Sequence, residues 1–133
     1  MRLDGFGLFV QDMGTMIRFY RDVLGFEIQE SEDAGNVYLV RTAPCSCSTG
    51  ERILPGKTGK EYGYAQGLNG HGEIALYVDT FEEVDRAFAQ VVAKGAAPVL
   101  EPVTQPWGQR TCYVADPEGN LIEIGSFNRP FGR

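Results

Sequence analysis

The fold is decided by residues 73–78, EIALYV, because a matching alternation of apolar and other residues stands at residues 5–10, GFGLFV. Leu8 corresponds to Leu76 and Val10 to Val78 when the two segments are aligned. Each segment is followed by apolar residues at helical spacing, and this pattern ends at a glycine in both copies. A repeat of this length is typical of a duplicated supersecondary unit rather than of a solenoid. We therefore expect two similar modules that share a functional cleft.

Outward from these two segments, the sequence predicts a strand, a helix and three strands in each module. Asp12 is the expected cap of the first helix, and Thr80 with Glu83 forms a capping box for the second. Residues 49–72 are rich in glycine and predict a polar linker between modules at about 3–48 and 73–128. The expected strands are residues 3–10, 26–30, 37–41 and 43–48 in the first module, and 73–78, 99–103, 110–114 and 121–126 in the second. The fold class is α+β, with two tandem βαβββ modules.

Length and charge limit the classes of function. A chain of 133 residues with 43% hydrophobic residues has the size of one globular domain. A net charge of −6 argues against nucleic acid as a partner, because binding the phosphate backbone requires a basic surface. No apolar run is long enough for a membrane helix, and the first residues lack the apolar core of a signal peptide. We therefore expect a cytoplasmic protein that contacts neither nucleic acid nor membrane.

Strand alternation predicts which side chains lie opposite the helices. If Ile74 and Leu76 of the one strand and Ile122 and Ile124 of the other pack against a helix, then Glu73, Tyr77 and Glu123 share the opposite face. A glutamate on a strand is more often a solvated residue than a functional one. Aromatic neighbours, among them Phe9, favour a ligand site instead, and Trp107 would either contact ligand or anchor its own loop. From the strand pattern alone the two interpretations are balanced.

Two motifs carry a resemblance to a known family. Residues 19–26, FYRDVLGF, and residues 116–124, DPEGNLIEI, in the context of the duplicated module, resemble the vicinal oxygen chelate superfamily. This group includes glyoxalases, extradiol dioxygenases and bleomycin resistance proteins. The resemblance covers nearly the whole chain. It implies a single domain in which a curled mixed sheet surrounds a cup, with the helices on the outer face and a second subunit often completing the cup. A homodimer is accordingly expected.

Only some of the positions that bind metal in the family carry a metal-binding side chain in this sequence. The first ligand position falls on Gly5, which has no side chain, and the second falls on Glu73. Glu123 matches the eighth-strand ligand, whereas the fourth-strand ligand falls among residues 45–48 in a register that the sequence leaves open. His71 is expected in a loop, and a set of His71, Glu73 and Glu123 is the alternative. A catalytic metal usually needs three protein ligands, so the metal chemistry of the family is in doubt for this chain.

Two functions follow from the resemblance. The first is binding of a small molecule without a metal ion. The molecule would be hydrophobic or planar and, in one form of this hypothesis, cationic. Its contacts would be Phe9, Tyr77, Trp107, Tyr113, Glu73 and Glu123. The alternative is a lyase, isomerase or dioxygenase that uses Zn²⁺, Ni²⁺, Mn²⁺ or Fe²⁺ on a substrate with vicinal oxygens, with Glu123 as a ligand and Glu73 as a ligand or the catalytic base. The gap at Gly5 favours the first function.

Overall fold

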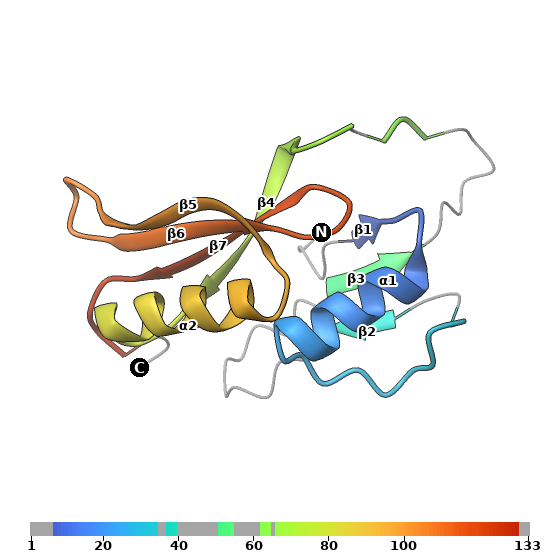
Figure 1. Cartoon of the computed structure of the whole chain (residues 1–133), viewed down its shortest axis with the longest axis horizontal. Helices are drawn as coiled ribbons and strands as arrows, with labels where there is room; N and C mark the ends of the chain where they lie inside the picture. Colours follow the sequence, from blue (N-terminus) through green and yellow to red (C-terminus); the bar gives the residue numbers. More distant parts are fainter. Residues whose placement is uncertain (1–6, 35–36, 40–50, 55–61, 65, 131–133) are drawn as a thin grey trace, which may run out of the picture. The chain divides into compact units, whose positions relative to one another are not determined.

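The computed structural model describes residues 7–34, 37–39, 51–54, 62–64 and 66–130 (Figure 1). The chain divides into two compact units, Met1–Tyr64 and Ala65–Arg133. Each unit contains a small mixed sheet and a helical segment that precedes most of its strands. The chain therefore has the expected α+β class. No helix of the described residues is long and apolar enough to cross a membrane.

The first unit has a three-stranded sheet in the order β1-β3-β2. β1 pairs with β3 in parallel, and β2 pairs with β3 in antiparallel orientation. Its elements are β1 (Gly7–Phe9), α1 (Met13–Arg18), a π-helical turn η1 (Phe19–Val23), β2 (Val37–Leu39) and β3 (Glu51–Leu54).

The first helix begins as predicted but changes its winding after one and a half turns. Asp12 caps α1 by accepting a hydrogen bond from the Thr15 amide at 3.0 Å. After Arg18 the helix widens, and the Leu24 amide donates to the Phe19 carbonyl five residues earlier at 3.1 Å. This π-helical turn buries the consecutive side chains of Phe19 and Tyr20 together, with their rings edge to face at 5.5 Å. The apolar pattern that ends at Gly25 predicts one continuous α-helix, and this prediction is wrong for the last turn, which is π-helical.

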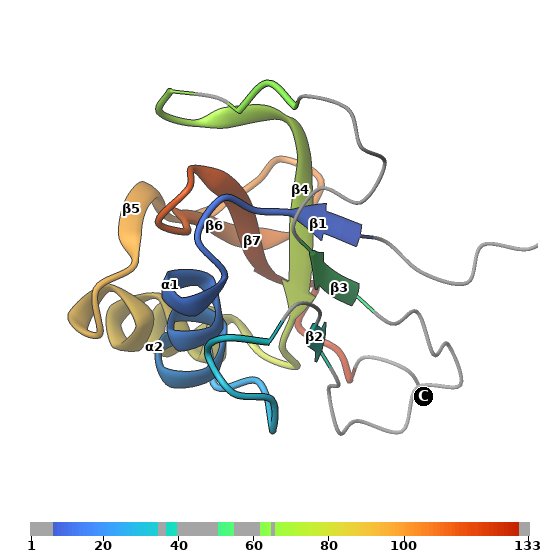
Figure 2. The same cartoon turned by 90° about the vertical axis from the view of Figure 1, so that its right-hand side faces the viewer.

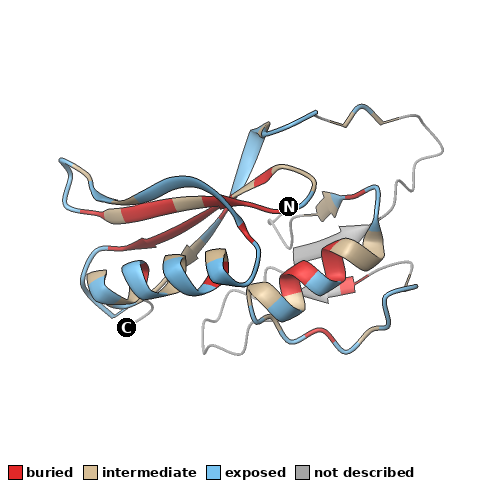
Figure 3. Ribbon diagram, viewed as in Figure 1, coloured by how far each residue is buried: buried red, intermediate tan, exposed pale blue. Residues whose placement is uncertain are grey.

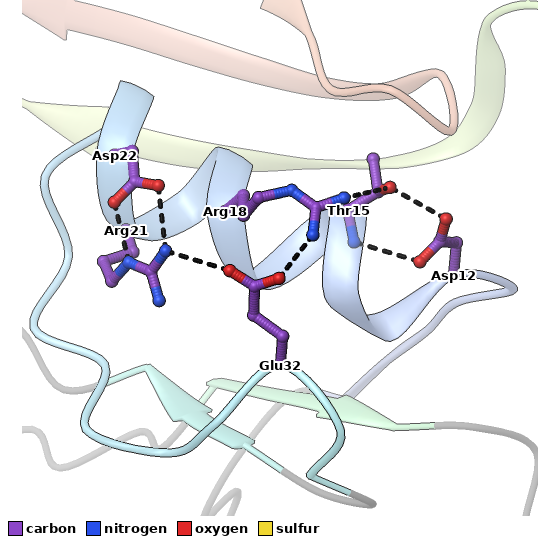
Figure 4. Close-up of polar contacts among 6 residues, drawn as sticks. All are labelled: Asp12, Thr15, Arg18, Arg21, Asp22 and Glu32. Atoms are coloured by element: carbon purple, nitrogen blue, oxygen red, sulfur yellow. Dashed lines mark hydrogen bonds and ion pairs between the residues drawn. The ribbon is translucent and has the colours of Figure 1, made fainter.

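The strand predicted at residues 26–30 is also wrong, because only an isolated bridge residue, Glu27, occurs there. The Phe26 amide donates to the Tyr20 carbonyl at 2.9 Å and so closes the helix. Farther along the same loop, the Glu32 carboxylate accepts hydrogen bonds from the guanidinium groups of Arg18 and Arg21 (Figure 4). These contacts hold the loop against the helix instead of extending it into a hairpin.

Two further expectations concern residues 40–72. The strand predicted at 43–48 lies outside the described residues. Gly5, the first metal-ligand position that the resemblance implies, lies outside them as well. Residues 49–72 are not an irregular linker throughout, because Glu51–Leu54 form β3, the central strand of the first sheet. Pairing on both sides supplies the hydrogen bonds that make this short segment a strand.

The second unit has the predicted βαβββ order. Its four strands form a sheet in the order β4-β7-β6-β5, with β4 and β7 parallel and the other pairs antiparallel. Figures 1 and 2 show the helix lying along one face of this sheet, where it packs on β5, β6 and β7. The elements are β4 (Asn69–Tyr77), α2 (Phe81–Ala93), β5 (Ala97–Thr104), β6 (Arg110–Ala115) and β7 (Asn120–Ser126).

The start of α2 and the core below it agree with the sequence. Thr80 accepts from the Glu83 amide at 3.2 Å, and the Glu83 carboxylate accepts from the Thr80 amide at 2.9 Å, which completes the capping box. Buried residues of the helix and sheet form the core of this unit (Figure 3), among them Val84, Val91, Cys112, Val114, Ile122 and Ile124. Burial raises the pKa of the Cys112 thiol to about 12.

The first strand of this unit starts at Asn69, earlier than the predicted residue 73. The Asn69 amide donates to the Gly119 carbonyl at 2.6 Å, and its side chain donates to the Asn120 carboxamide oxygen at 2.9 Å. These bonds extend the pairing of β4 with β7 beyond a bulge that lies between Asn69 and Glu73. Part of the predicted linker is therefore sheet.

Candidate functional site

The candidate site lies on the face of the second sheet opposite α2. Glu123 of β7 pairs with Ala75 of β4 on one side and with Tyr113 of β6 on the other. Two residues farther along, Gly125 pairs with Tyr77 and with Thr111. Because side chains alternate between the two faces of a strand, all of these residues share one face. The intervening isoleucines of β7 are buried on the helix side, as the sequence predicts.

Glu123 is the centre of this face and is only 6% exposed. Its Oε1 accepts a hydrogen bond from Gln109 Nε2 at 2.9 Å and another from Thr111 Oγ1 at 2.8 Å. The Tyr77 hydroxyl lies 3.5 Å from its Oε2. A buried carboxylate without such donors would be strongly unfavourable. The interpretation of Glu123 as an ordinary solvated residue is therefore wrong.

Gln109 connects Glu123 to the rim of the sheet. Its amide nitrogen also donates to the Tyr77 hydroxyl at 3.0 Å, and its amide oxygen accepts from Trp107 Nε1 at 2.9 Å. Gly125 provides space for this amide, since a Cβ atom at position 125 would lie 2.9 Å from Gln109 Nε2. We call Trp107, Gln109, Thr111, Tyr77 and Glu123 the Glu123 cluster.

The two tyrosines of this face are harder to ionise than tyrosine in water. Burial, followed by the charge of Glu123, raises the pKa of Tyr77. Burial, followed by a hydrogen bond to the Glu73 carboxylate, raises the pKa of Tyr113. Both hydroxyls therefore stay protonated at neutral pH and can serve as hydrogen-bond donors.

Apolar and aromatic side chains border the cluster. Trp107 is 65% exposed although its indole N–H is bonded to Gln109. The ring of Phe127 is nearly parallel to that of Tyr77, with centroids 6.1 Å apart, and the Arg129 guanidinium lies 5.4 Å from the Phe127 centroid. Leu100 and Val103 of β5 are exposed and pair with Tyr113 and Thr111. A polar anchor among apolar surfaces is the usual composition of a small-molecule site.

The structure brings together most, but not all, of the predicted site residues. Tyr77, Trp107 and Glu123 belong to the cluster, and Tyr113 with Glu73 lies beside it. Trp107 does not anchor its loop by burial, because its ring is exposed. Phe9 belongs to the first unit, where it stacks on Tyr62 at 5.2 Å, so its part in the site stays a prediction.

Among the described residues, the donor set of this face does not form a site for a divalent metal ion. His71 lies in β4 rather than in a loop, and its side chain is exposed. Within the residues that the structure describes, no three His, Cys, Asp or Glu side chains lie close enough together to hold a metal. His71, Glu73 and Glu123 are therefore not gathered into one ligand set. Oε1 of Glu123 is in addition already occupied by two hydrogen-bond donors.

Sequence reasoning missed Gln109 and Thr111. Their positions carry a usable signal, because residues 109, 111 and 113 alternate along β6 and its preceding residue, and Tyr113 pairs with Glu123. A carboxylate predicted on a buried face requires hydrogen-bond donors from neighbouring strands. Their identification requires the register of β6 against β7, which the structure supplies.

Comparisons with known proteins agree with this architecture. Residues 2–124 match the family model of the Glyoxalase/Bleomycin resistance protein/Dioxygenase superfamily. A virulence protein of Salmonella typhimurium is 26% identical over 129 residues, which are 95% of this chain and 84% of that protein.

Solved structures resemble the chain over nearly its whole length. A protein of unknown function from Agrobacterium tumefaciens is 27% identical, with a TM-score of 0.72 over 95% of this chain and 94% of that one. A glyoxalase-related enzyme from Fulvimarina pelagi is 19% identical, with a TM-score of 0.74 over 94% of this chain and 87% of that one. At 19% identity the second likeness shows the fold alone.

Proposed function

Because the chain belongs to the Glyoxalase/Bleomycin resistance protein/Dioxygenase superfamily, we propose that it binds a small organic molecule, without a metal ion, on the sheet face that carries Glu123. The ligand has a hydrophobic or planar body. Its polar group is cationic or donates hydrogen bonds. Binding, rather than bond making or breaking, is the proposed activity.

One observation carries this proposal, namely the buried Glu123 carboxylate at the centre of an aromatic surface. The structural core of the unit lies on the other face of the sheet, against α2, so the cluster is not needed to bury the helix. A buried charged network costs free energy compared with apolar packing. Its presence opposite the core supports a role in recognition.

The surrounding side chains support a planar ligand body. Trp107 offers an exposed indole, and the pair of Tyr77 and Phe127 offers a second aromatic surface. Aromatic rings bind flat partners by offset or edge-to-face contacts, and an electron-rich ring also attracts cations. The Glu123 carboxylate then supplies the polar anchor.

Calorimetric titration with one-ring and two-ring aromatic amines and amidines tests this function. We expect saturable binding by the purified protein. Trp107→Ala should weaken it by about two- to tenfold, because an aromatic contact contributes about 0.5–1.5 kcal/mol. Leu68→Ala is the matched control, since Leu68 is also an exposed apolar residue but lies next to the Gly119 turn, at the other end of β6 from Trp107.

The same titration can contradict the proposal. Equal weakening by Trp107→Ala and Leu68→Ala would mean that this face is not the binding surface. If no compound of the panel gave a saturable heat of binding, the proposed binding function itself would be wrong.

A further inference from the structure

We infer that Gln109, bonded to Trp107, Tyr77 and Oε1 of Glu123, holds the Glu123 carboxylate with Oε2 as its remaining acceptor, so that the site selects amidinium-type donors and rejects carboxylates. This inference rests on the proposed binding function and names the chemical class of its ligand. Gln109 is a positioning residue in it, acting through Glu123.

The direction of the hydrogen-bond chain is determined at the tryptophan. An indole N–H can only donate, so the Gln109 atom that lies 2.9 Å from Trp107 Nε1 must be the amide oxygen. The amide nitrogen then points to Glu123 Oε1 and to the Tyr77 hydroxyl, at 2.9 and 3.0 Å. The opposite orientation would place two donors together at Trp107 and two acceptors together at Glu123.

The contacts of the Glu123 carboxylate show which of its two oxygens can accept a hydrogen bond from a ligand. Oε1 of Glu123 accepts from Gln109 and from Thr111 Oγ1, so it faces two protein donors. Oε2 has the Tyr77 hydroxyl at 3.5 Å, which is long compared with the roughly 2.5–2.7 Å of a strong O–H···O⁻ bond. Oε2 is therefore the oxygen with acceptor capacity remaining for a ligand donor.

Charge on this face favours the same class of ligand. Glu73 adds a second carboxylate beside Tyr113. Arg110 lies on the opposite, α2 face of the sheet, where it is bonded to Asp85 with the nitrogen and oxygen 2.7 Å apart, and Arg129 lies over the Phe127 ring. Neither guanidinium is bonded to Glu123 or Glu73 in the described contacts. An anionic ligand group would meet like charge here, whereas an amidinium would be attracted.

Benzamidine, benzamide and benzoate provide the test, because they share one ring and differ in the charge and hydrogen bonding of their polar group. Binding can be followed by fluorescence of Trp107, the single tryptophan of the chain. We expect the wild-type protein to bind benzamidine at least about tenfold more tightly than benzoate, since a hydrogen bond to a charged group contributes roughly 1.5–3 kcal/mol.

Glu123→Gln should reverse this preference. Gln109 and Thr111 donate to the Oε1 position, so the new amide must place its oxygen there and its NH₂ group at the former Oε2 position. That group donates where the carboxylate accepted. Benzamidine affinity should fall about tenfold, and benzoate should bind more tightly than it does to the wild type.

Gln109→Met keeps the length of the side chain without its hydrogen bonds and serves as the second variant. We expect it to reduce the ratio of benzamidine to benzoate affinity and to weaken benzamide less than benzamidine, because a neutral donor makes the weaker bond to a carboxylate. A purely structural role of Gln109 would instead weaken all three ligands equally, and that result would overturn the inference. Thermal unfolding of each variant checks that it is folded.

Failure of the inference can be told apart from failure of the proposed function. If the wild type binds all three compounds with equal affinity, the selectivity is wrong and the binding function stands. If the wild type binds none of them and none of the aromatic amines either, both are wrong.

Discussion

At the scale of single residues, Tyr113 and Tyr77 lie beside two carboxylates, and burial raises the pKa of each hydroxyl. A tyrosine is neutral below its pKa, so the folded state stabilises the protonated form relative to the unfolded chain. This contribution to stability is fully present below the ordinary value of about 10 and is lost as the pH rises through the raised values.

The absorbance of tyrosinate during an alkaline titration measures these raised pKa values. Tyr77 and Tyr113 should ionise above the ordinary pKa of tyrosine, and Tyr113→Phe should remove part of that late step. In the protein that keeps Tyr113, Glu73→Gln should shift the ionisation of this tyrosine to lower pH, because the substitution removes a negative charge that opposes ionisation. An unchanged late step in Tyr113→Phe would contradict the assignment.

The sequence predicts some residues of the site but not others. Glu73, Tyr77 and Glu123 follow from strand alternation, which needs only the strand period of two. Gln109 and Thr111 do not, because their importance comes from donating to Glu123 across a strand pair whose register the sequence leaves open. Sequence patterns indicate a face, whereas the partners on that face depend on register.

At the scale of elements, the turn that joins β6 to β7 has a glycine that no other residue can replace without strain. Gly119 has a φ of 85°, and a Cβ atom there would lie 1.8 Å from the Gly67 carbonyl oxygen. Gly119→Ala should therefore lower the free energy of unfolding by more than the roughly 1–2 kcal/mol that the left-handed conformation alone costs. Urea unfolding followed by circular dichroism measures the change.

Gly95→Ala is the matched control for this turn. Gly95 ends α2 with a φ of 107°, but a Cβ atom added there would have no neighbouring atom within 4 Å. This variant should lose only the conformational contribution. Equal losses for the two variants would mean that the contact between Gly119 and Gly67 does not constrain the β6–β7 turn.

Elements of the second unit were easier to predict than those of the first. The capping box of Thr80 and Glu83 and the closing Gly95 mark α2 at both ends, and its strands are long enough to show alternation. In the first unit β1 and β2 have three residues each, and the helix becomes a π-helical turn at Phe19. Such short strands and such a change of winding have no distinct sequence period.

At the scale of the whole molecule, the sequence repeat corresponds to two units with the same topological feature. In each unit the first strand pairs in parallel with the last described strand, β1 with β3 and β4 with β7. Gly25 and Gly95 both follow their helices with positive φ. The repeat predicts these equivalences. The division after Tyr64 falls within residues 49–72, the predicted linker, although β3 and the start of β4 also lie in that segment.

Binding of a metal ion would stabilise the whole folded chain, so thermal unfolding distinguishes the proposed function from the metal-dependent alternative. A metal at about a hundred times its dissociation constant stabilises a protein by about 2.7 kcal/mol, which corresponds to several degrees in Tm for a chain of this size. We expect chelator-treated protein to show no such shift with Zn²⁺, Ni²⁺, Mn²⁺ or Fe²⁺. The described side chains gather no three-ligand set, and Oε1 of Glu123 is committed to Gln109 and Thr111.

A shift of several degrees with one metal would overturn the metal-free proposal if Glu123→Gln abolishes it. The amide of that variant keeps the size of the side chain and its acceptor for Gln109, but it is a poor metal ligand compared with a carboxylate. Glu82→Gln, at an exposed position in the first turn of α2, controls for the loss of one negative charge. A shift that survives Glu123→Gln would locate the metal away from the Glu123 cluster, because a bound ion there requires that carboxylate, and would leave the cluster as a site for organic ligands.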